Sequence, residues 1–436
     1  MYASYRSAIY IPRRSNFISR LFLAKRPISS QPKTWILSDG FADSERQCVA
    51  LAKELNLPFE IKRIYLRKSL QWLPSIFQKW LIDVSSSLKG KKINEKLPWY
   101  LYSPRGDTLS QPFPRYVLAS GRESVPACLT ATKLSRETFS VYLRFPPLPF
   151  LYFGAVILPS FEVFGRLIKY GPMASQRNLI RTELPLSVVN PQSLAVASQD
   201  VHKSDWLALP TQFLKRDQTA PLVTFLLGGP TRECNYDSKQ IERLSRAINT
   251  LVEQHSARVL VVYTDRTPSN VRGIISRGLS ELGSRDASRV KTLSVDAKDG
   301  DPRAYMAALA IADRVVVSAD SPSMVSDAVA AKKPVYIAYQ SSSKGANALF
   351  HKLLKEKKLT RKFRPVSDRV KGQVETSIGD GKYLDAMSSF GEHDVWAFKG
   401  DPDEKGRSGA QEGSRKAARE IENMWETRSG TVRRRR

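Results

Sequence analysis

Polar turns follow three apolar stretches in the second half of the chain, and their residue types suit an anionic, hydroxyl-bearing ligand. The apolar stretches are 221–227, 258–263 and 315–317. Loops at the C-terminal ends of parallel strands line one crevice of a doubly wound sheet, so we expect these turns to meet. Glycines let a backbone approach a ligand closely, and free N–H groups at a helix start bind phosphate. The residues expected to form this nucleotide- or anion-binding site are Gly228, Gly229, Thr231, Arg232, Thr264, Arg266, Thr267, Asp320, Ser321, Ser323 and Met324.

The third turn belongs to a strand–helix–strand unit that spans residues 314–338. Val315–Val317 is a β-branched run, typical of a strand buried on both faces. Pro322 suits the first helical position, and Pro334 ends the helix before a second strand. Taken alone, this unit is better explained by an ordinary capped crossover helix. The glycine turn at 228–229 favours a ligand site, although it matches neither G-x-G-x-x-G nor a Walker P-loop.

Two strand ends in the first half of the chain carry similar chemistry. Strands are predicted at Thr34–Leu37 and Tyr116–Ala119, and the second is followed by a helix start with an adjacent arginine. The residues expected to line this side of a cleft are Ser38, Asp39, Gly40, Gly121, Arg122 and Ser124. An alternative explains the same residues equally well: Arg122 is a surface residue and Ser124 only a helix cap.

Taken together, these motifs resemble those of the plant mitochondrial-fission "elongated mitochondria" family and its bacterial relatives. The matching stretches occur in order across 34–428, at 38–40, 121–127, 227–232, 266–268, 319–328, 333–336 and 350–352. The resemblance implies an α/β, GT-B glycosyltransferase-like scaffold with two Rossmann-like, doubly wound domains facing a cleft. In such folds the C-terminal domain holds the nucleotide, and an acidic residue on the helix after the serine-rich turn binds the ribose. That role would belong to Asp327, where the family usually has Glu.

Two positions depart from the family pattern in a way that bears on catalysis. Asp43 and Ser44 stand where the family usually has Gly and His, which removes a good candidate for a general base. We therefore assign no catalytic residue. The first hypothesis is a non-catalytic mitochondrial fission factor that recruits a dynamin-type GTPase. The alternative is a glycosyltransferase or another enzyme that binds a nucleotide-diphosphate sugar.

Composition limits the partners of this 436-residue chain. Its net charge of +27 suits nucleic acid or an anionic membrane surface. The basic runs do not interleave with aromatic residues as a nucleic-acid stacking platform would, so we expect no nucleic acid. Solvated surface explains most of the charge, and attraction to anionic lipid is the functional alternative. Three cysteines and four histidines are scattered without the spacing of a metal site.

The first 33 residues predict a mitochondrial presequence. They hold seven basic residues and no acidic one. Import would place the chain in the matrix, whereas the resemblance implies the cytosolic face of the outer membrane, which we weakly prefer. The uncharged stretch Phe145–Phe161 is broken by prolines and too short to span a bilayer. We expect a packed loop and a buried strand at Gly154–Leu158 there; an aromatic loop that dips into a membrane is the alternative.

The domain organisation follows from these elements. Trp72, Phe77, Trp80 and Leu81 predict a helix or two packed on the first sheet, and Pro191–Thr219 reads as a linker. A last helix at Ser414–Arg428 is expected to cross back onto the first domain, with Trp425 in the core. The predicted segments are a presequence (1–33), an N-terminal Rossmann-like domain with linker (34–215), a C-terminal Rossmann-like domain (216–365), a mobile insertion (366–392), a terminal segment with the returning helix (393–428) and a basic tail (429–436).

Overall fold

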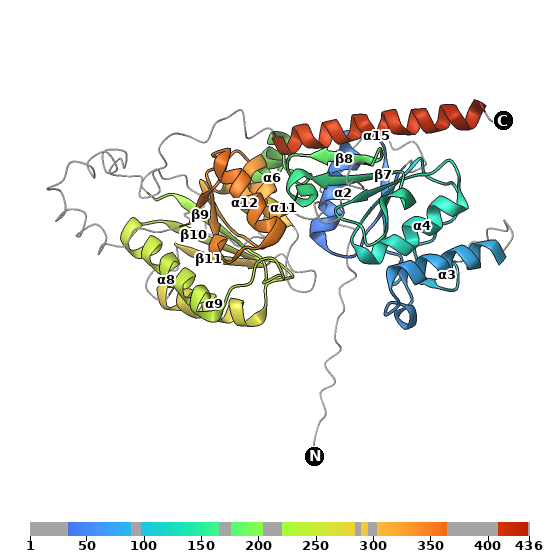
Figure 1. Ribbon diagram of the computed structural model, residues 1–436. Helices are drawn as coiled ribbons and strands as arrows, with labels where there is room; N and C mark the ends of the chain where they lie inside the picture. Colours follow the sequence, from blue (N-terminus) through green and yellow to red (C-terminus); the bar gives the residue numbers. More distant parts are fainter. Residues whose placement is uncertain are drawn as a thin grey trace, which may run out of the picture.

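The computed structural model of the chain describes residues 34–88, 97–164, 176–203, 220–283, 289–294, 303–363 and 409–434. These residues form two six-stranded sheets in which neighbouring strands are parallel. The two sheets lie side by side, and one long helix runs from their junction over the first domain (Figure 1). The predicted α/β class with two doubly wound domains is confirmed. The predictions for 1–33, 366–392 and 393–408 lie outside the described residues.

The first sheet has the strand order β2-β1-β5-β6-β7-β8. Its strands are β1 (Thr34–Leu37), β2 (Phe59–Lys62), β5 (Tyr116–Ser120), β6 (Phe139–Leu143), β7 (Ala155–Pro159) and β8 (Leu179–Thr182). Its helices are α2 (Ala42–Glu54), α3 (Ser75–Leu88), α4 (Val125–Leu134) and the short α5 (Ser160–Glu162), with 3-10 turns η1 (Lys68–Leu70), η2 (Arg122–Ser124) and η3 (Phe150–Tyr152). A separate antiparallel ribbon pairs β3 (Tyr65–Leu66) with β4 (Leu101–Tyr102).

The second sheet has the strand order β11-β10-β9-β12-β13-β14. Its strands are β9 (Leu222–Leu227), β10 (Arg258–Tyr263), β11 (Val290–Ser294), β12 (Arg314–Ser318), β13 (Val335–Ala338) and β14 (Arg361–Lys362). Its helices are α8 (Ser238–His255), α9 (Ser269–Gly283), α10 (Arg303–Ile311), α11 (Pro322–Ala330) and α12 (Gly345–Glu356), with the 3-10 turn η7 (Gln340–Ser342). The apolar runs read from the sequence are buried on both faces, as expected of parallel strands between helices.

The strand order reverses once in each sheet, and both reversals position turns singled out from the sequence. In the second sheet β9 and β12 are neighbours although two strands, β10 and β11, separate them in the chain order, and in the first sheet β1 and β5 are neighbours. Ligands of doubly wound sheets bind at such a switch point, outside the carboxyl ends of the strands. The turns after these four strands are among those expected to carry the site, together with the turn after β10.

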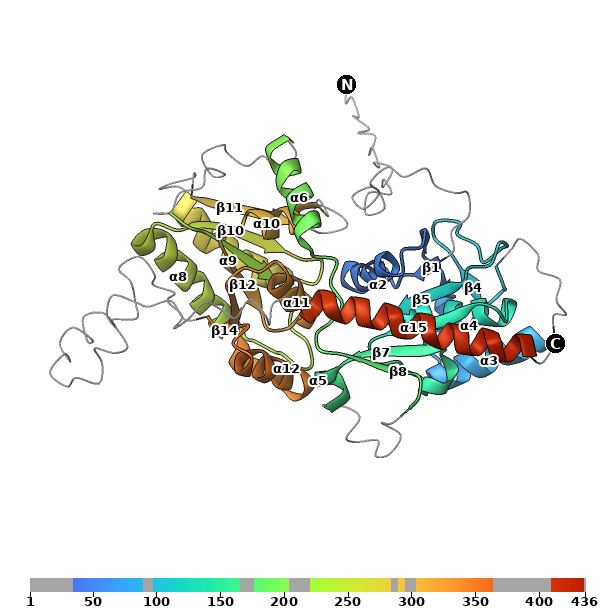
Figure 2. The same cartoon turned by 90° about the horizontal axis from the view of Figure 1, so that it is seen from above.

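Helix α6 (Pro191–Lys203) occupies the first part of the segment predicted as a linker. It packs against α10 of the second domain, so this part of the connection is an ordered helix and not a plain linker. Helix α15 (Gly409–Arg434) returns to the first domain and contacts α2, β8 and α11, as expected (Figure 2). The Trp425 ring lies 6.4 Å from that of Tyr116. The helix continues to Arg434, so most of the predicted basic tail is helical.

Two aromatic regions of the first domain differ in their burial. Phe150 and Phe153 are buried and β7 begins at Ala155, so the loop packs as predicted, although Leu151 between the two rings is exposed. The helix predicted around Trp80 exists as α3, but Trp72 and Trp80 are exposed and not packed on the sheet. None of the helices in the described part of the chain combines the length and the apolar composition needed to cross a bilayer.

Candidate functional site

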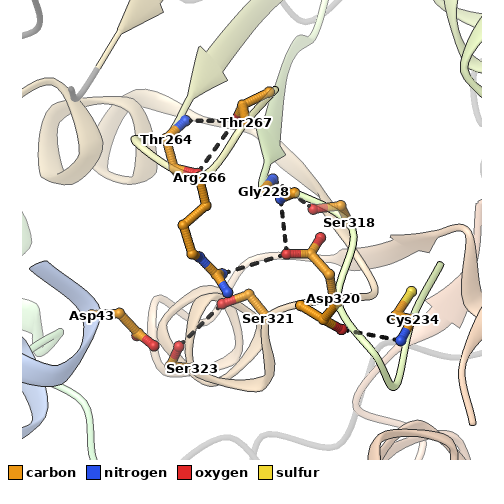
Figure 3. A network of polar contacts seen from close by, with 12 residues as sticks. Asp43, Gly228, Cys234, Thr264, Arg266, Thr267, Ser318, Asp320, Ser321 and Ser323 are labelled. Atoms are coloured by element: carbon orange, nitrogen blue, oxygen red, sulfur yellow. Dashed lines mark hydrogen bonds and ion pairs between the residues drawn. The ribbon is translucent and has the colours of Figure 1, made fainter. Parts of the chain in front are cut away.

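The three turns predicted to form an anion site in the second domain do meet (Figure 3). The carboxylate of Asp320, after β12, accepts a hydrogen bond from the Gly229 backbone N–H at 3.1 Å. The Arg266 guanidinium, after β10, lies 3.4 Å from the same carboxylate oxygen. Ser318 accepts a hydrogen bond from the Gly228 N–H at 2.8 Å. Asp320 therefore holds together the turns after β9, β10 and β12.

The glycines after β9 serve this close packing, which differs from their expected role. A Cβ atom on Gly228 would lie 2.1 Å from the Asp320 carboxylate. On Gly229 it would lie 2.0 Å from the backbone carbonyl oxygen of Arg266. The backbone approaches neighbouring turns here, so replacing either glycine would force the turns apart.

Several side chains predicted to bind a ligand are instead engaged inside the protein. Thr267 donates a hydrogen bond to the Leu227 carbonyl at 2.6 Å, and Thr264 donates to the same oxygen at 3.3 Å. Thr231 accepts a hydrogen bond from the Cys234 N–H within its own turn. The remaining members of the predicted set differ in exposure: Met324 is buried in the core, Ser321 and Ser323 are buried at the start of α11, and Arg232 is exposed.

Asp327, which the family resemblance assigns to a ribose, is bound within the protein. Its Oδ1 accepts a hydrogen bond from Ser187 at 2.5 Å, and its Oδ2 accepts one from Tyr305 at 2.9 Å. Arg46, on α2 of the first domain, lies 3.7 Å from Oδ2 and stacks 4.2 Å above the Tyr305 ring. Burial raises the pKa of Asp327, while Arg46 and the two hydroxyls oppose that rise. This carboxylate joins the two domains, and the expected ribose contact stays a prediction.

A second carboxylate at the contact between the domains is that of Asp43, on α2 of the first domain. It lies at the start of α11 (Figure 3). No side chain caps this helix start, where an anion is favoured. Cationic and hydroxyl groups of both domains act on the carboxylate: Arg46, Arg144, Arg266 and Ser323. Burial would raise the pKa of Asp43, but the guanidinium groups outweigh it and hold the pKa below its ordinary value. The anion at this helix start is thus supplied by the first domain itself.

The switch point of the first sheet is built from its own turn. Asp39, after β1, accepts hydrogen bonds from the Phe41 N–H and from the Ser44 hydroxyl, each at 3.1 Å. A Cβ atom on Gly121 would lie 1.8 Å from the Asp39 carboxylate, and Gly121 has a φ of 87°. Burial raises the pKa of Asp39 to about 6, against the lowering effect of these hydrogen bonds. Ser38 donates to the Glu45 carboxylate at 2.7 Å, while Gly40 is exposed.

The contacts of Arg122 and Ser124 bear on whether these residues form an anion site or are only a surface residue and a helix cap. The Ser124 hydroxyl donates to the backbone carbonyls of Ser120 and Gly121, so it stabilises its own turn. Arg122 is exposed and reaches the Leu73 carbonyl at 3.5 Å. Both observations fit the structural interpretation better than an anion site.

Four residues that the sequence reasoning missed complete the cleft: Arg46, Arg144, Ser187 and Tyr305. Arg144 directly follows β6 and has a φ of 76°, so its place at a strand end was a usable signal. Arg46 lies one helical turn after Asp43, which was also visible. Ser187 is 140 residues from its partner Asp327, and nothing local indicated that contact.

Comparison with known proteins supports the motif resemblance over most of this structure. The family model of the mitochondrial fission ELM1 proteins matches residues 42–380, which include all the cleft turns except 38–40. The chain belongs to this family. Among relatives, the mitochondrial fission protein ELM1 of Arabidopsis thaliana is 25% identical over 382 residues, covering 76% of this chain and 84% of the relative. An uncharacterized protein of Rickettsia prowazekii is 23% identical over 355 residues, covering 76% and 90%.

Solved structures similar to this fission-family chain include two carbohydrate-related enzymes. A glycosyltransferase from Rickettsia africae covers 92% of this chain and 98% of its own, with a TM-score of 0.39 and 11% identity. An α,α-trehalose-phosphate synthase from Burkholderia vietnamiensis covers 88% of this chain and 78% of its own, with the same score and identity. These scores are low, so the fold assignment rests on the two strand orders. Membership of the fission family associates the chain with the mitochondrion and with its division.

Proposed function

We propose that the chain is a non-catalytic mitochondrial division factor that acts on the cytosolic face of the outer membrane and recruits a dynamin-type GTPase. The observation that carries the non-catalytic part is the ion pair between Arg46 and Asp327, which joins the first domain to the second. Asp43 adds a second crossing contact at the start of α11. Contacts of this kind hold the two domains together, as suits a scaffold, and the fold by itself does not imply an activity.

Asp43 and Asp327 are also poorly suited to act as bases. A general base works best when its pKa lies near the operating pH. Arginines hold the pKa of Asp43 below its ordinary value, and both oxygens of Asp327 accept hydrogen bonds from side chains. Neither group is suited to take a proton from a sugar hydroxyl.

Recruitment and location rest on family membership, because fission machinery assembles on the outside of the mitochondrion. Protease treatment of intact mitochondria tests the location. Digestion of the full-length chain supports the outer face. A shortened, protected form would mean import, as the acid-free residues 1–33 suggest, and would exclude contact with a cytosolic GTPase.

Depletion of the chain from the cells that encode it tests the function. Mitochondria should elongate, and re-expression of the chain should restore their length. Because the proposed role needs no proton transfer in the cleft, an Asp43→Asn variant that remains folded should also restore it. Sugar transfer by the purified chain that disappears in Asp43→Asn would overturn the proposal in favour of an enzyme.

Asp39 favours a second candidate function, a nucleotide-sugar-dependent enzyme. Its pKa of about 6 is that of a usable base, and it lies at the switch point of the first sheet. A thermal-shift screen of the wild type with nucleotide-sugars, followed by Asp39→Asn in a turnover assay, tests this candidate. Turnover in the wild type that is lost in Asp39→Asn supports it, and stabilisation by no nucleotide-sugar contradicts it.

A further inference from the structure

Helix α3 presents an apolar face to solvent. Ile76, Trp80 and Val84 recur at four-residue spacing along the helix, which places them on one side, and Trp72 lies in the turn just before the helix. Their exposed fractions are 77%, 50%, 62% and 37%, and Phe77 beside them is 57% exposed. We call these five residues the α3 face. Large apolar side chains gathered on one surface mark an interaction site more often than scattered ones do.

The opposite side of α3 already packs on the domain, so the exposed side is not a misplaced core. Ile82 is fully buried, and the buried Gln78 donates a hydrogen bond to the Leu73 carbonyl at 2.8 Å. Both views place α3 at the outer end of the first domain, away from the second sheet (Figures 1 and 2). The α3 face therefore lies far from the interdomain cleft.

Charge around the α3 face points to an anionic partner. Four basic side chains of the described residues lie just before the helix, on it or in contact with it: Arg67, Lys68, Lys79 and Lys133. Both Lys79 and Lys133 pair with Asp83 of the helix, so the charge of this carboxylate is neutralised locally. Arg67 and Lys68, just before the helix, are exposed.

The indole of Trp72 is suited to burial in an apolar medium. Its N–H donates to the Ser69 carbonyl at 2.7 Å, so moving the ring out of water leaves no unpaired donor. Leu151 of η3 is 69% exposed, and the neighbouring Tyr152 ring lies 4.5 Å beneath the Lys79 ammonium. Tryptophans flanked by cations are typical of surfaces that sit at the boundary between lipid headgroups and acyl chains.

We propose that the α3 face docks the chain onto the surface of a bilayer that contains anionic phospholipid. Insertion of the aromatic and aliphatic side chains would supply apolar burial, and the surrounding cations would bind lipid phosphates. A bilayer fits this face better than an acidic protein because its exposed tryptophans and aliphatic side chains lie beside exposed cations. The inference is independent of the division role: a chain with no part in fission would still bind vesicles.

Vesicle co-sedimentation of the full chain tests the apolar part of the proposal. Binding should be strong on phosphatidylcholine vesicles that contain phosphatidylserine and weak on phosphatidylcholine alone. The pair Trp72→Ser and Trp80→Ser should weaken binding about tenfold or more, because two interfacial anchors are lost. Phe164→Ser is the matched control: this ring is 51% exposed, and the neighbouring Phe161 packs 4.6 Å from Phe350 at the domain junction. Its binding should equal that of the wild type.

A charge series tests the electrostatic part. Each basic residue near an anionic surface contributes about 1 kcal/mol, so Arg67→Gln with Lys68→Gln should reduce binding about 30-fold. The control pair is Lys239→Gln with Arg243→Gln, two exposed basic residues of α8 in the second domain. Raising the salt concentration should remove the difference between the two pairs.

Two outcomes would overturn the proposal. Equal vesicle binding by the wild type and the folded double tryptophan variant would show that another surface meets the membrane. Absent vesicle binding, together with a wild-type dimer that the same variant converts to monomers, would assign the α3 face to a second copy of the chain. Unchanged circular dichroism and melting temperature of each variant establish that it is folded.

Discussion

The switch points of the two sheets share one local arrangement, an aspartate packed against a glycine, but the two aspartates differ in their hydrogen-bond partners. In each, an aspartate after one strand fills the space left by a glycine after the neighbouring strand: Asp39 against Gly121, and Asp320 against Gly228. Burial raises the pKa of both aspartates to about 6. Asp39, however, accepts hydrogen bonds from within its own turn, whereas Asp320 binds groups from two other turns.

The difference indicates which of the two domains depends more on contacts between separate turns. A turn that closes on itself tolerates movement of its neighbours. A carboxylate that joins three turns makes the position of each depend on the other two. Substitutions in the second domain should therefore have larger and more coupled effects than their counterparts in the first.

The largest expected effect is that of Gly229→Val. A side chain there meets the Arg266 backbone carbonyl, which cannot rotate away, so we expect a loss of stability of about 3 kcal/mol. Urea unfolding measures the change, with Gly273→Ala as control because nothing lies within 4 Å of the added Cβ. Equal stabilities of the two variants would contradict the packing account.

The second prediction concerns pH and Asp320. Its pKa of about 6 exceeds that of an ordinary aspartate, so the native state keeps a proton that the unfolded chain has lost between pH 4 and 6. Stability from this group is therefore present at low pH and is lost as the pH rises through about 6. Relative to the wild type, Asp320→Asn should gain up to about 3 kcal/mol between pH 4 and 7, at 1.4 kcal/mol per pKa unit.

Unfolding free energies of both proteins across this pH range measure the difference. Subtracting one free energy from the other removes contributions that both proteins share. One of these comes from His351: burial lowers its pKa to about 4, so its contribution to stability is lost as the pH falls, opposite to that of Asp320. A constant difference from pH 4 to 7 would mean that Asp320 titrates normally. Asp39→Asn should show the same trend with a smaller amplitude, because this side chain is partly exposed.

The third prediction tests whether the first domain occupies the anion site of the second. Asp43→Gly, which restores the usual residue of the family, removes the carboxylate from the start of α11. Uridine diphosphate should then bind at least about tenfold more tightly than to the wild type, by isothermal titration. Ser44→Gly, next to it on α2, is the control and should leave the affinity unchanged. Equal affinities of Asp43→Gly and wild type would show that this carboxylate does not occupy the anion site.

Much of the fold could be predicted from the sequence because its determinants are local. Runs such as Val315–Val317 can hardly be anything but buried strands, and Pro322 and Pro334 bracket α11. The convergence of the cleft turns followed from the rule that parallel strands end at one edge. The contact between Ser187 and Asp327 could not be read in this way, since it depends on how the two domains face each other.

The exposure of α3 was missed for a related reason. Its aromatic residues have the composition of a core helix, and composition alone does not tell which side of a helix meets the protein. Gln78, a polar residue among them, is buried, while Trp72 is exposed. The concentration of basic residues around the helix was the available signal, because cations rarely surround a buried face.

The smallest predicted effect compares two hydroxyl groups, one at each switch point. Thr267 joins the turn after β10 to β9 by donating to Leu227, and it also accepts a hydrogen bond from the Thr264 N–H. Ser124 donates only to carbonyls of its own turn. Thr267→Val should lower the unfolding free energy by about 1 kcal/mol, since other groups still donate to the Leu227 carbonyl. Ser124→Ala should lower it by about 0.5 kcal/mol, because its carbonyl partners belong to the same turn. The difference between the two losses of unfolding free energy is small, but the loss should be larger in Thr267→Val. A larger loss in Ser124→Ala would mean that the first switch point, and not the second, depends on hydrogen bonds between neighbouring turns.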